Sequence, residues 1–137
     1  MPGRASAAVL VLEEPLSFWG GMDPDTGEVI DRRHPQTGAS LAGRVVAMPA
    51  GRGSSSSSSV LAEAIRAGTA PAAILLREPD GIVALGAMVA GELYGLWCPV
   101  VALDPGEHSR LRDGDLVAVE ADEDGTVVRY AEEGGTR

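Results

Sequence analysis

The sequence is poor in residues that hold metals and disulfides. It contains one cysteine, Cys98, and two histidines among 137 residues. One cysteine excludes an internal disulfide, and it cannot supply the thiolate set that a zinc ion or an iron–sulfur cluster requires. Because Cys98 lies in the apolar run Leu96–Val101, we expect its thiol to be buried and inert. No metal or cofactor is therefore expected to bind to this chain alone.

Lysine is absent, and the eleven basic residues, all arginine, are outnumbered by twenty acidic ones. The resulting net charge of −9 argues against a nucleic-acid-binding surface, which needs clustered basic side chains. No apolar run approaches the length of a membrane span, and the first eight residues lack the apolar stretch of a signal peptide. We therefore expect a cytoplasmic protein without membrane or nucleic-acid partners.

Aromatic residues make up only 4% of the chain, so its core must be aliphatic. A length of 137 residues predicts one domain, 1–137, with an ordered core of about residues 7–130. Continuous apolar runs, typical of strands covered on both faces, are Ala7–Leu12, Leu41–Ala47, Ala72–Arg77 and Cys98–Leu103.

Helical spacing predicts helices at Val60–Gly68 and Ile82–Tyr94. The two glycines inside the second, Gly86 and Gly91, would permit close packing against a sheet. Alternation predicts a hairpin of Leu116–Glu120 and Thr126–Tyr130, and a short strand is expected at Glu28–Asp31. The predicted fold class is α/β, with a small parallel sheet, helices and a layer of antiparallel strands.

A long segment from Leu16 to Gly27 is dense in turn-forming residues. Loops of this length inside a compact domain are usually functional or disordered. We expect an ordered loop in which Phe18 and Trp19 anchor the segment against the core.

The most informative stretch is Pro49–Gly53, followed by six serines, Ser54–Ser59. It stands between a predicted strand and a predicted helix, where backbone N–H groups and the helix dipole favour an anion. Gly51 and Gly53 would let the backbone approach that ligand, and Arg52 offers a bidentate donor. The alternative is a low-complexity linker, although the apolar segments on both sides argue against it.

Two polar residues elsewhere are ambiguous when they are considered alone. His34 stands in a polar loop, where a solvated or loop-bracing role is the default. Asp23, which precedes a proline, is most often a turn residue in such a context.

Several motifs, in this order, make the sequence resemble the aconitase X family small subunit. They are Gly20–Gly27 (GGMDPDTG), His34-Pro35, Pro49–Ser58 (PAGRGSSSSS), Leu85–Gly95 (LGAMVAGELYG) and the hairpin at Asp113-Gly114-Asp115. The resemblance covers about residues 7–130 and implies a swivelling β/β/α domain similar to the mobile domain of aconitase.

The resemblance also implies a hydro-lyase that acts only as a complex of two subunits. The large subunit carries an iron–sulfur cluster that acts as a Lewis acid, and the small subunit supplies a serine base, here Ser54. Arg52 and Ser55 would bind the anionic group of a small hydroxy-acid substrate. The other substrate-binding residues implied are Gly51, Gly53, Ser56, Gly21, Asp23 and His34. Known substrates of the family are cis-3-hydroxy-L-proline and (R)-5-phosphomevalonate.

The chemistry of the residues fits this division of work. Elimination of water needs a base, an acid for the leaving group and clamps for a carboxylate. A serine is a poor base at its free pKa, so it must act as an alkoxide or be assisted by nearby positive charge. The rival hypothesis is a non-catalytic anion-binding or assembly module that uses the Gly-Ser loop as a docking site.

Overall fold

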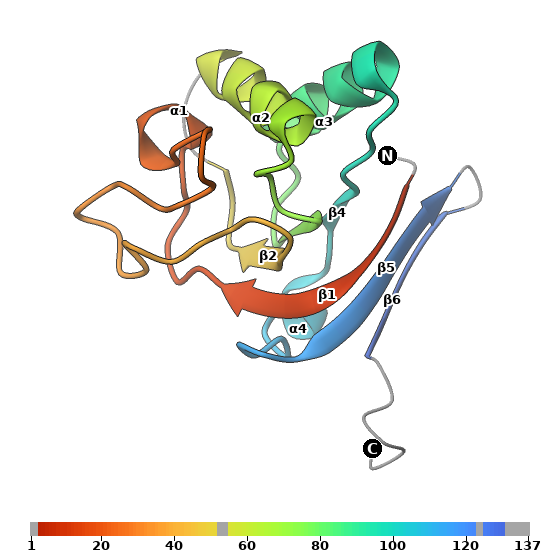
Figure 1. Ribbon diagram of the computed structural model, residues 1–137. Coiled ribbons are helices and arrows are strands. Elements are labelled where there is room, and N and C mark those ends of the chain that lie inside the picture. The colour runs from red at the N-terminus through yellow and green to blue at the C-terminus, as the bar shows by residue number, and fades with distance from the viewer. Residues whose placement is uncertain (1–2, 52–54, 123–124, 131–137) are drawn as a thin grey trace.

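The computed structural model describes residues 3–51, 55–122 and 125–130 (Figure 1). One curled sheet has the strand order β4-β3-β2-β1-β5-β6. Its strands are β1 (Gly3–Val11), β2 (Val45–Met48), β3 (Ala73–Leu76), β4 (Val100–Ala102), β5 (Leu116–Asp122) and β6 (Gly125–Tyr130). The helices are α1 (Phe18–Gly21), α2 (Ser55–Ala67), α3 (Gly81–Tyr94) and α4 (Pro105–His108).

Strands β1 to β4 form the parallel half of the sheet, with α2 and α3 in its crossover connections. Every residue of β2 and β3 is buried, which explains why both appear as continuous apolar runs. Alternate side chains serve two cores. Val46 and Ile74 pack in the cluster that includes residues of α2 and α3, and Val45 and Ala73 pack in the cluster on the opposite face.

The opposite face is covered by the antiparallel strands. Val117 and Val119 of β5 are fully buried in the same cluster as Val45. The sequence predicted these strands as a separate layer, but β1 belongs to both halves. Its residues Gly3–Ala8 pair with β5 and its residues Val9–Val11 pair with β2. The predicted α/β fold with two strand layers and one helix layer is confirmed, and a single curved strand joins the strand layers (Figure 1).

Three element predictions need correction. The strand predicted from Leu41 begins at Val45, because Gly43 adopts a φ of 70° in a turn closed by the Arg44 N–H and the Leu41 carbonyl. The region predicted as strand Glu28–Asp31 forms only single bridges, at Glu28 and Val29. Helix α2 begins at Ser55, so it contains most of the serine run.

Helix α3 shares the core with the sheet, but its two glycines do not face the sheet as predicted: Gly86 faces α2 and Gly91 faces Trp97. A Cβ at Gly86 would lie 2.6 Å from the carbonyl oxygen of Ser58, so only glycine permits this approach. The other glycine, Gly91, lies against the ring of Trp97. Asp80 caps α3 by accepting hydrogen bonds from the N–H groups of Ile82 and Val83 at 2.9 and 3.0 Å.

Among the helices of the described segments, none has the length and apolar character that crossing a bilayer requires.

Candidate functional site

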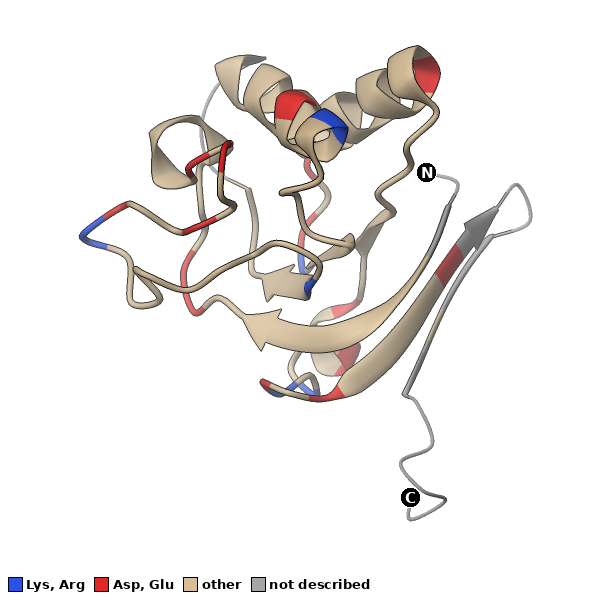
Figure 2. Ribbon diagram, in the orientation of Figure 1, with Lys and Arg blue, Asp and Glu red and all other residues tan. Residues whose placement is uncertain are grey.

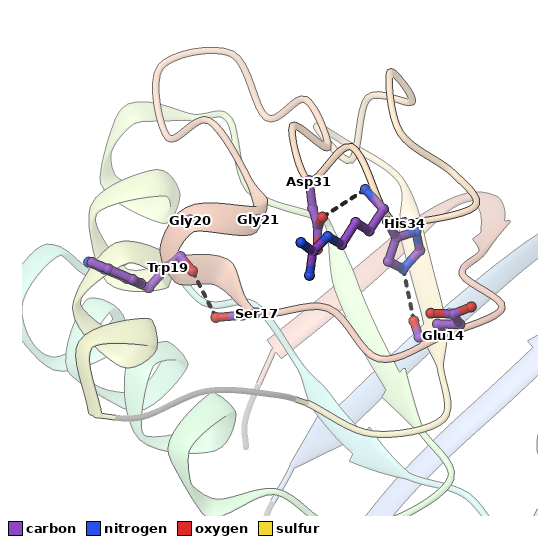
Figure 3. Close-up of a pocket in the computed structure, with 8 residues that line it drawn as sticks. Glu14, Ser17, Trp19, Gly20, Gly21, Asp31 and His34 are labelled. Carbon is purple, nitrogen blue, oxygen red and sulfur yellow. Dashed lines mark hydrogen bonds between the residues drawn. The ribbon is translucent and has the colours of Figure 1, made fainter.

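A pocket of about 370 Å³ opens where the chain leaves the carboxyl end of β1 (Figure 3). Ligands of parallel α/β sheets commonly bind at this edge. The pocket lies between the turn that carries α1 and the segment 31–34. Its lining residues are Glu14, Ser17, Trp19, Gly20, Gly21, Asp31, Arg33 and His34.

His34 is held by the backbone on both sides of its ring. The side chain is only 4% exposed. Its Nδ1 accepts a hydrogen bond from the Gln36 N–H at 3.0 Å, so Nε2 carries the proton and donates to the Glu14 carbonyl at 3.0 Å. The histidine therefore fixes Glu14 at the pocket wall, as Figure 3 shows.

Gly21 closes the pocket beside the core. The Cβ of any other residue there would lie 2.9 Å from Cδ1 of Leu16, and the Gly21 carbonyl accepts a hydrogen bond from the Ile30 N–H. The α1 turn contains non-helical backbone at Trp19 and Gly20. The loop is ordered as predicted and Phe18 is buried, but Trp19 is 63% exposed, so its predicted anchoring role is wrong.

The pocket is tied to both flanks of the glycine-serine loop. Before the loop, Leu16 and Gly51 form a parallel bridge. After it, the buried Ser57 of α2 lies 3.1 Å from Oγ of Ser17 and accepts a 3.4 Å hydrogen bond from the Trp19 N–H. The segment 16–19 thus lines the pocket and contacts the chain immediately before and after residues 52–55.

Helix α3 contacts the same two flanks from another side. A Cβ at Gly51 would lie 2.4 Å from Oδ2 of Asp80, the capping residue of α3. Gly86 of α3 lies against the backbone of Ser58. The glycine at position 51 is therefore required by packing, whatever its role toward a ligand.

The structure brings together some of the predicted site residues. Gly21 and His34 lie in the pocket, and Gly51 lies at the entrance to the serine loop. Ser55 and Ser56 open α2, with Ser56 exposed. The predicted residues Arg52, Gly53 and Ser54 lie outside the described residues.

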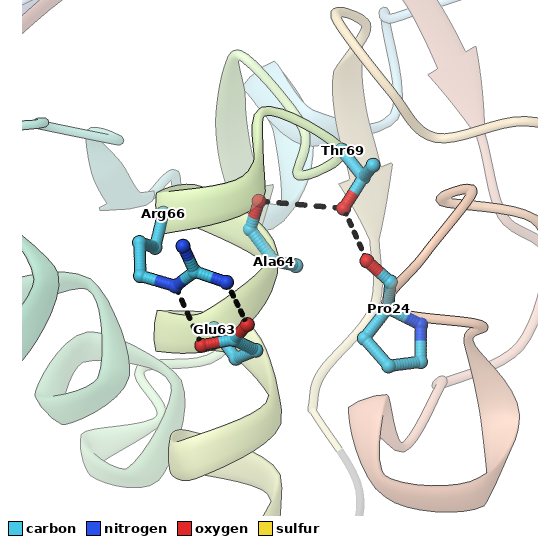
Figure 4. A network of polar contacts seen from close by, with 5 residues as sticks. All are labelled: Pro24, Glu63, Ala64, Arg66 and Thr69. Carbon is cyan, nitrogen blue, oxygen red and sulfur yellow. Dashed lines mark hydrogen bonds and ion pairs between the residues drawn. The ribbon is translucent and has the colours of Figure 1, made fainter.

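Asp23 does not line the pocket. Its Oδ1 accepts a hydrogen bond from the Asp25 N–H at 2.8 Å, and its carbonyl accepts one from the Gly27 N–H. This turn rests on the end of α2, where the Thr69 hydroxyl donates to the Pro24 carbonyl (Figure 4). Asp23 thus shapes the loop that supports the pocket.

Six residues of the lining were not predicted as site residues: Glu14, Ser17, Trp19, Gly20, Asp31 and Arg33. The sequence offers one indication for Ser17, a polar residue between the apolar residues Leu16 and Phe18. Both of these neighbours are buried in the structure. Asp31 and Arg33 are close in sequence to His34, but single-sequence patterns do not show which way such loop side chains point.

The described residues contain no group of three histidine, cysteine or acidic side chains placed to hold a metal ion. Cys98 is buried, and its thiol donates to the Pro71 carbonyl at 3.4 Å. Burial raises the pKa of this thiol to about 12, which keeps it protonated and a poor metal ligand. The burial of Cys98 predicted from the sequence is confirmed.

Comparisons with known proteins agree on one family. The sequence model of the aconitase X swivel domain matches residues 1–128. A cis-3-hydroxy-L-proline dehydratase of Pseudomonas aeruginosa is 54% identical over 123 residues, which cover 83% of this chain and 21% of the relative. The phosphomevalonate dehydratase small subunit of Thermococcus onnurineus is 40% identical over 121 residues, covering 88% of this chain and 87% of the relative.

The same family emerges from solved structures. The crystal structure of Thermococcus kodakaraensis aconitase X in its holo-form superposes with a TM-score of 0.82 and 37% identity, covering 96% of this chain and 92% of that one. The chain thus spans about a fifth of the length of the hydroxyproline dehydratases that it matches, and most of the length of the small subunit.

Proposed function

Because the chain belongs to the aconitase X swivel domain family, we propose that it is the small subunit of a two-subunit hydro-lyase. In this proposal the enzyme removes water from a small hydroxy-carboxylate and is active only when a large subunit is bound. The small subunits that it matches over most of their length are named as parts of a dehydratase, which supports the proposal.

One geometric observation carries the assignment of the site. The pocket lies beside both flanks of the glycine-serine loop, since segment 16–19 lines the pocket and contacts Gly51 and Ser57. We therefore propose that a proton acceptor supplied by this loop reaches a substrate in the pocket. Proximity of this kind is the main requirement for general base catalysis.

Ser54 is the proposed base, taking the proton from the carbon next to the substrate carboxylate. The next residue, Ser55, begins α2, so the positive end of this 13-residue helix favours negative charge in front of it. Arg52 is proposed to bind the anionic group together with Ser55, Ser56 and the backbone at Gly51 and Gly53. His34 and Gly21 shape the pocket wall, and Asp23 holds the supporting turn.

The residues of this chain do not fit an iron–sulfur cluster, because its single thiol is buried and held protonated. We therefore propose that any cluster belongs to the large subunit.

The pocket lining favours a zwitterionic substrate. Its described charged side chains are two carboxylates, Glu14 and Asp31, and one guanidinium, Arg33. A phosphate dianion would meet more negative than positive charge there, whereas an amino acid would find a partner for each of its charges. The 54% identity to a hydroxyproline dehydratase points the same way. We propose cis-3-hydroxy-L-proline as the substrate and (R)-5-phosphomevalonate as the second candidate.

The test is an anaerobic assay of the two-subunit complex on both compounds, comparing Ser54→Ala with wild type. Loss of a general base should lower kcat by about 10²–10⁴-fold. Ser59→Ala is the matched control, because Ser59 is an exposed residue of the same serine run and should leave kcat unchanged.

Other outcomes separate the alternatives. Turnover of phosphomevalonate alone would keep the lyase and replace the substrate. Nearly intact turnover by Ser54→Ala would reject Ser54 as the base and favour the non-catalytic anion-binding module. A serine run that can be deleted without loss of activity would identify it as a linker.

A further inference from the structure

Helix α3 carries almost no charge. Among its fourteen residues, Glu92 is the single aspartate, glutamate, lysine or arginine (Figure 2). The whole chain, by contrast, has a net charge of −9. Leu85 and Met88 are each 47% exposed. They lie three residues apart, on the side of α3 away from its buried residues Ala87 and Ala90.

A third large apolar side chain extends this surface. The ring of Trp97, 39% exposed, lies against Gly91, where an added Cβ would come within 2.0 Å of it. Gly91 is three residues after Met88, so the two positions are neighbours on the surface of the helix. We call the three exposed residues Leu85, Met88 and Trp97 the α3 strip.

The α3 strip is coupled to the proposed catalytic loop through rigid contacts. On its inner side α3 contacts Gly51 through Asp80 and Val83, and Ser58 through Gly86. These contacts leave no room for a Cβ, so α3 and both flanks of the loop move as one packed unit. A protein bound to the strip would therefore also hold Gly51 and Ser58, which stand on the two sides of the proposed catalytic loop.

We infer that the large subunit of the proposed enzyme binds the α3 strip; this inference rests on the proposed function. The hydroxyproline dehydratases supply the main argument, since this domain matches only about a fifth of their chains and four-fifths remain to contact it. An exposed apolar strip on a strongly acidic chain is the surface that such a permanent neighbour would cover. Because α3 contacts Gly51 and Ser58, docking on the strip would also position the two ends of the proposed catalytic loop.

The experiment measures the dissociation constant between this chain and the aconitase X large subunit of the same genome, by calorimetry under anaerobic conditions. The test variant is Leu85→Lys/Met88→Lys. Lysine forms helices well, and the lysine at position 88 lies four residues before Glu92, so the helix itself should be preserved. Ala67→Lys is the control, an exposed position in the last turn of α2. We expect the double variant to bind at least about tenfold more weakly and the control to bind like wild type.

A second measurement guards against misfolding of the double variant. Hydrogen exchange of the wild-type chain should show new protection within residues 85–94 when the large subunit is added. Wild-type affinity in the double variant, or protection confined to other segments, would overturn the inference. So would a self-associated form of this chain that the two lysines dissociate, because it would assign the strip to a second copy. Failure of the wild-type chain to bind any large subunit would instead reject the proposed function.

Discussion

At the scale of single residues, His34 illustrates how a pocket residue can act without touching the reacting atoms. Both ring nitrogens are occupied by backbone groups, the Gln36 N–H and the Glu14 carbonyl. The geometry therefore gives His34 a positioning role at the pocket wall, which agrees with the loop-bracing role that its sequence context favoured.

Cys98 provides a pH-dependent prediction. Because burial raises its pKa to about 12 from an ordinary 9.0, the folded thiol stays neutral while the unfolded thiol ionises above about pH 9. Unfolding then releases a proton, so this group's contribution to stability is complete below pH 9 and falls as pH rises toward 12. The free energy of unfolding should fall by at most about 1.4 kcal/mol per pH unit because of this thiol.

Urea unfolding at pH 9.5 and 10.5 tests this prediction against Cys98→Ala. The variant keeps every other titrating group, so its stability should fall less between the two pH values than that of wild type. The folded wild-type thiol should also resist alkylation that goes to completion in denaturant. Equal pH dependence in the two proteins, or rapid alkylation of the native chain, would contradict the assignment.

Sequence reasoning was reliable for residues whose environment is set by their neighbours in the chain. Cys98 lies inside an apolar run and is buried as predicted, although Leu96 and Trp97 at the start of that run are exposed. Trp19 was predicted wrongly, because apolar character alone does not tell which of two adjacent aromatic residues enters the core. The backbone at Trp19 and Gly20 is not helical, and the indole of Trp19 is exposed while Phe18 is buried.

At the scale of elements, the contact between α2 and α3 depends on Gly86. Gly86→Ala improves helix propensity by about 1 kcal/mol, but its Cβ would meet the Ser58 carbonyl oxygen at 2.6 Å. Relieving that clash requires the two helices to separate. We expect a net destabilisation of about 1–3 kcal/mol.

The control for this prediction is Gly81→Ala in the same helix. A Cβ at Gly81 meets nothing within 4 Å, so this variant should be as stable as wild type or slightly more stable. Urea denaturation midpoints compare the two variants directly. If Gly86→Ala unfolded at the wild-type midpoint, the close packing of α2 on α3 would not be the reason for the glycine.

The extent of α2 shows what local patterns miss. Apolar spacing predicted a helix from Val60, whereas α2 begins at Ser55. Serine is an indifferent helix former, so nothing in the run itself extends the helix. The buried contact of Ser57 with Ser17 and Trp19 is tertiary, and it holds part of the serine run in place.

At the scale of the whole molecule, the sequence predicted the two strand layers but not their connection. Parallel strands were evident from continuous apolar runs, and the hairpin from alternation and a turn. The first half of β1 has no such pattern, because Gly3–Ser6 are small or polar. These residues pair with β5, far away in the sequence, with Ala5 opposite Val119. Such a pairing depends on contacts across the sheet and not on a local pattern.

From the residues of the whole chain we predict that the isolated protein does not bind an iron–sulfur cluster. Its one cysteine is buried and protonated, and the described residues offer no cluster of metal ligands. Anaerobic treatment of the purified chain with iron and sulfide should therefore leave it without the visible absorbance of an iron–sulfur cluster and without dehydratase activity. The same treatment in the presence of the large subunit should produce both. Cluster absorbance in the isolated chain that disappears in Cys98→Ser would contradict the proposed division between the subunits, because it would make this thiol a ligand.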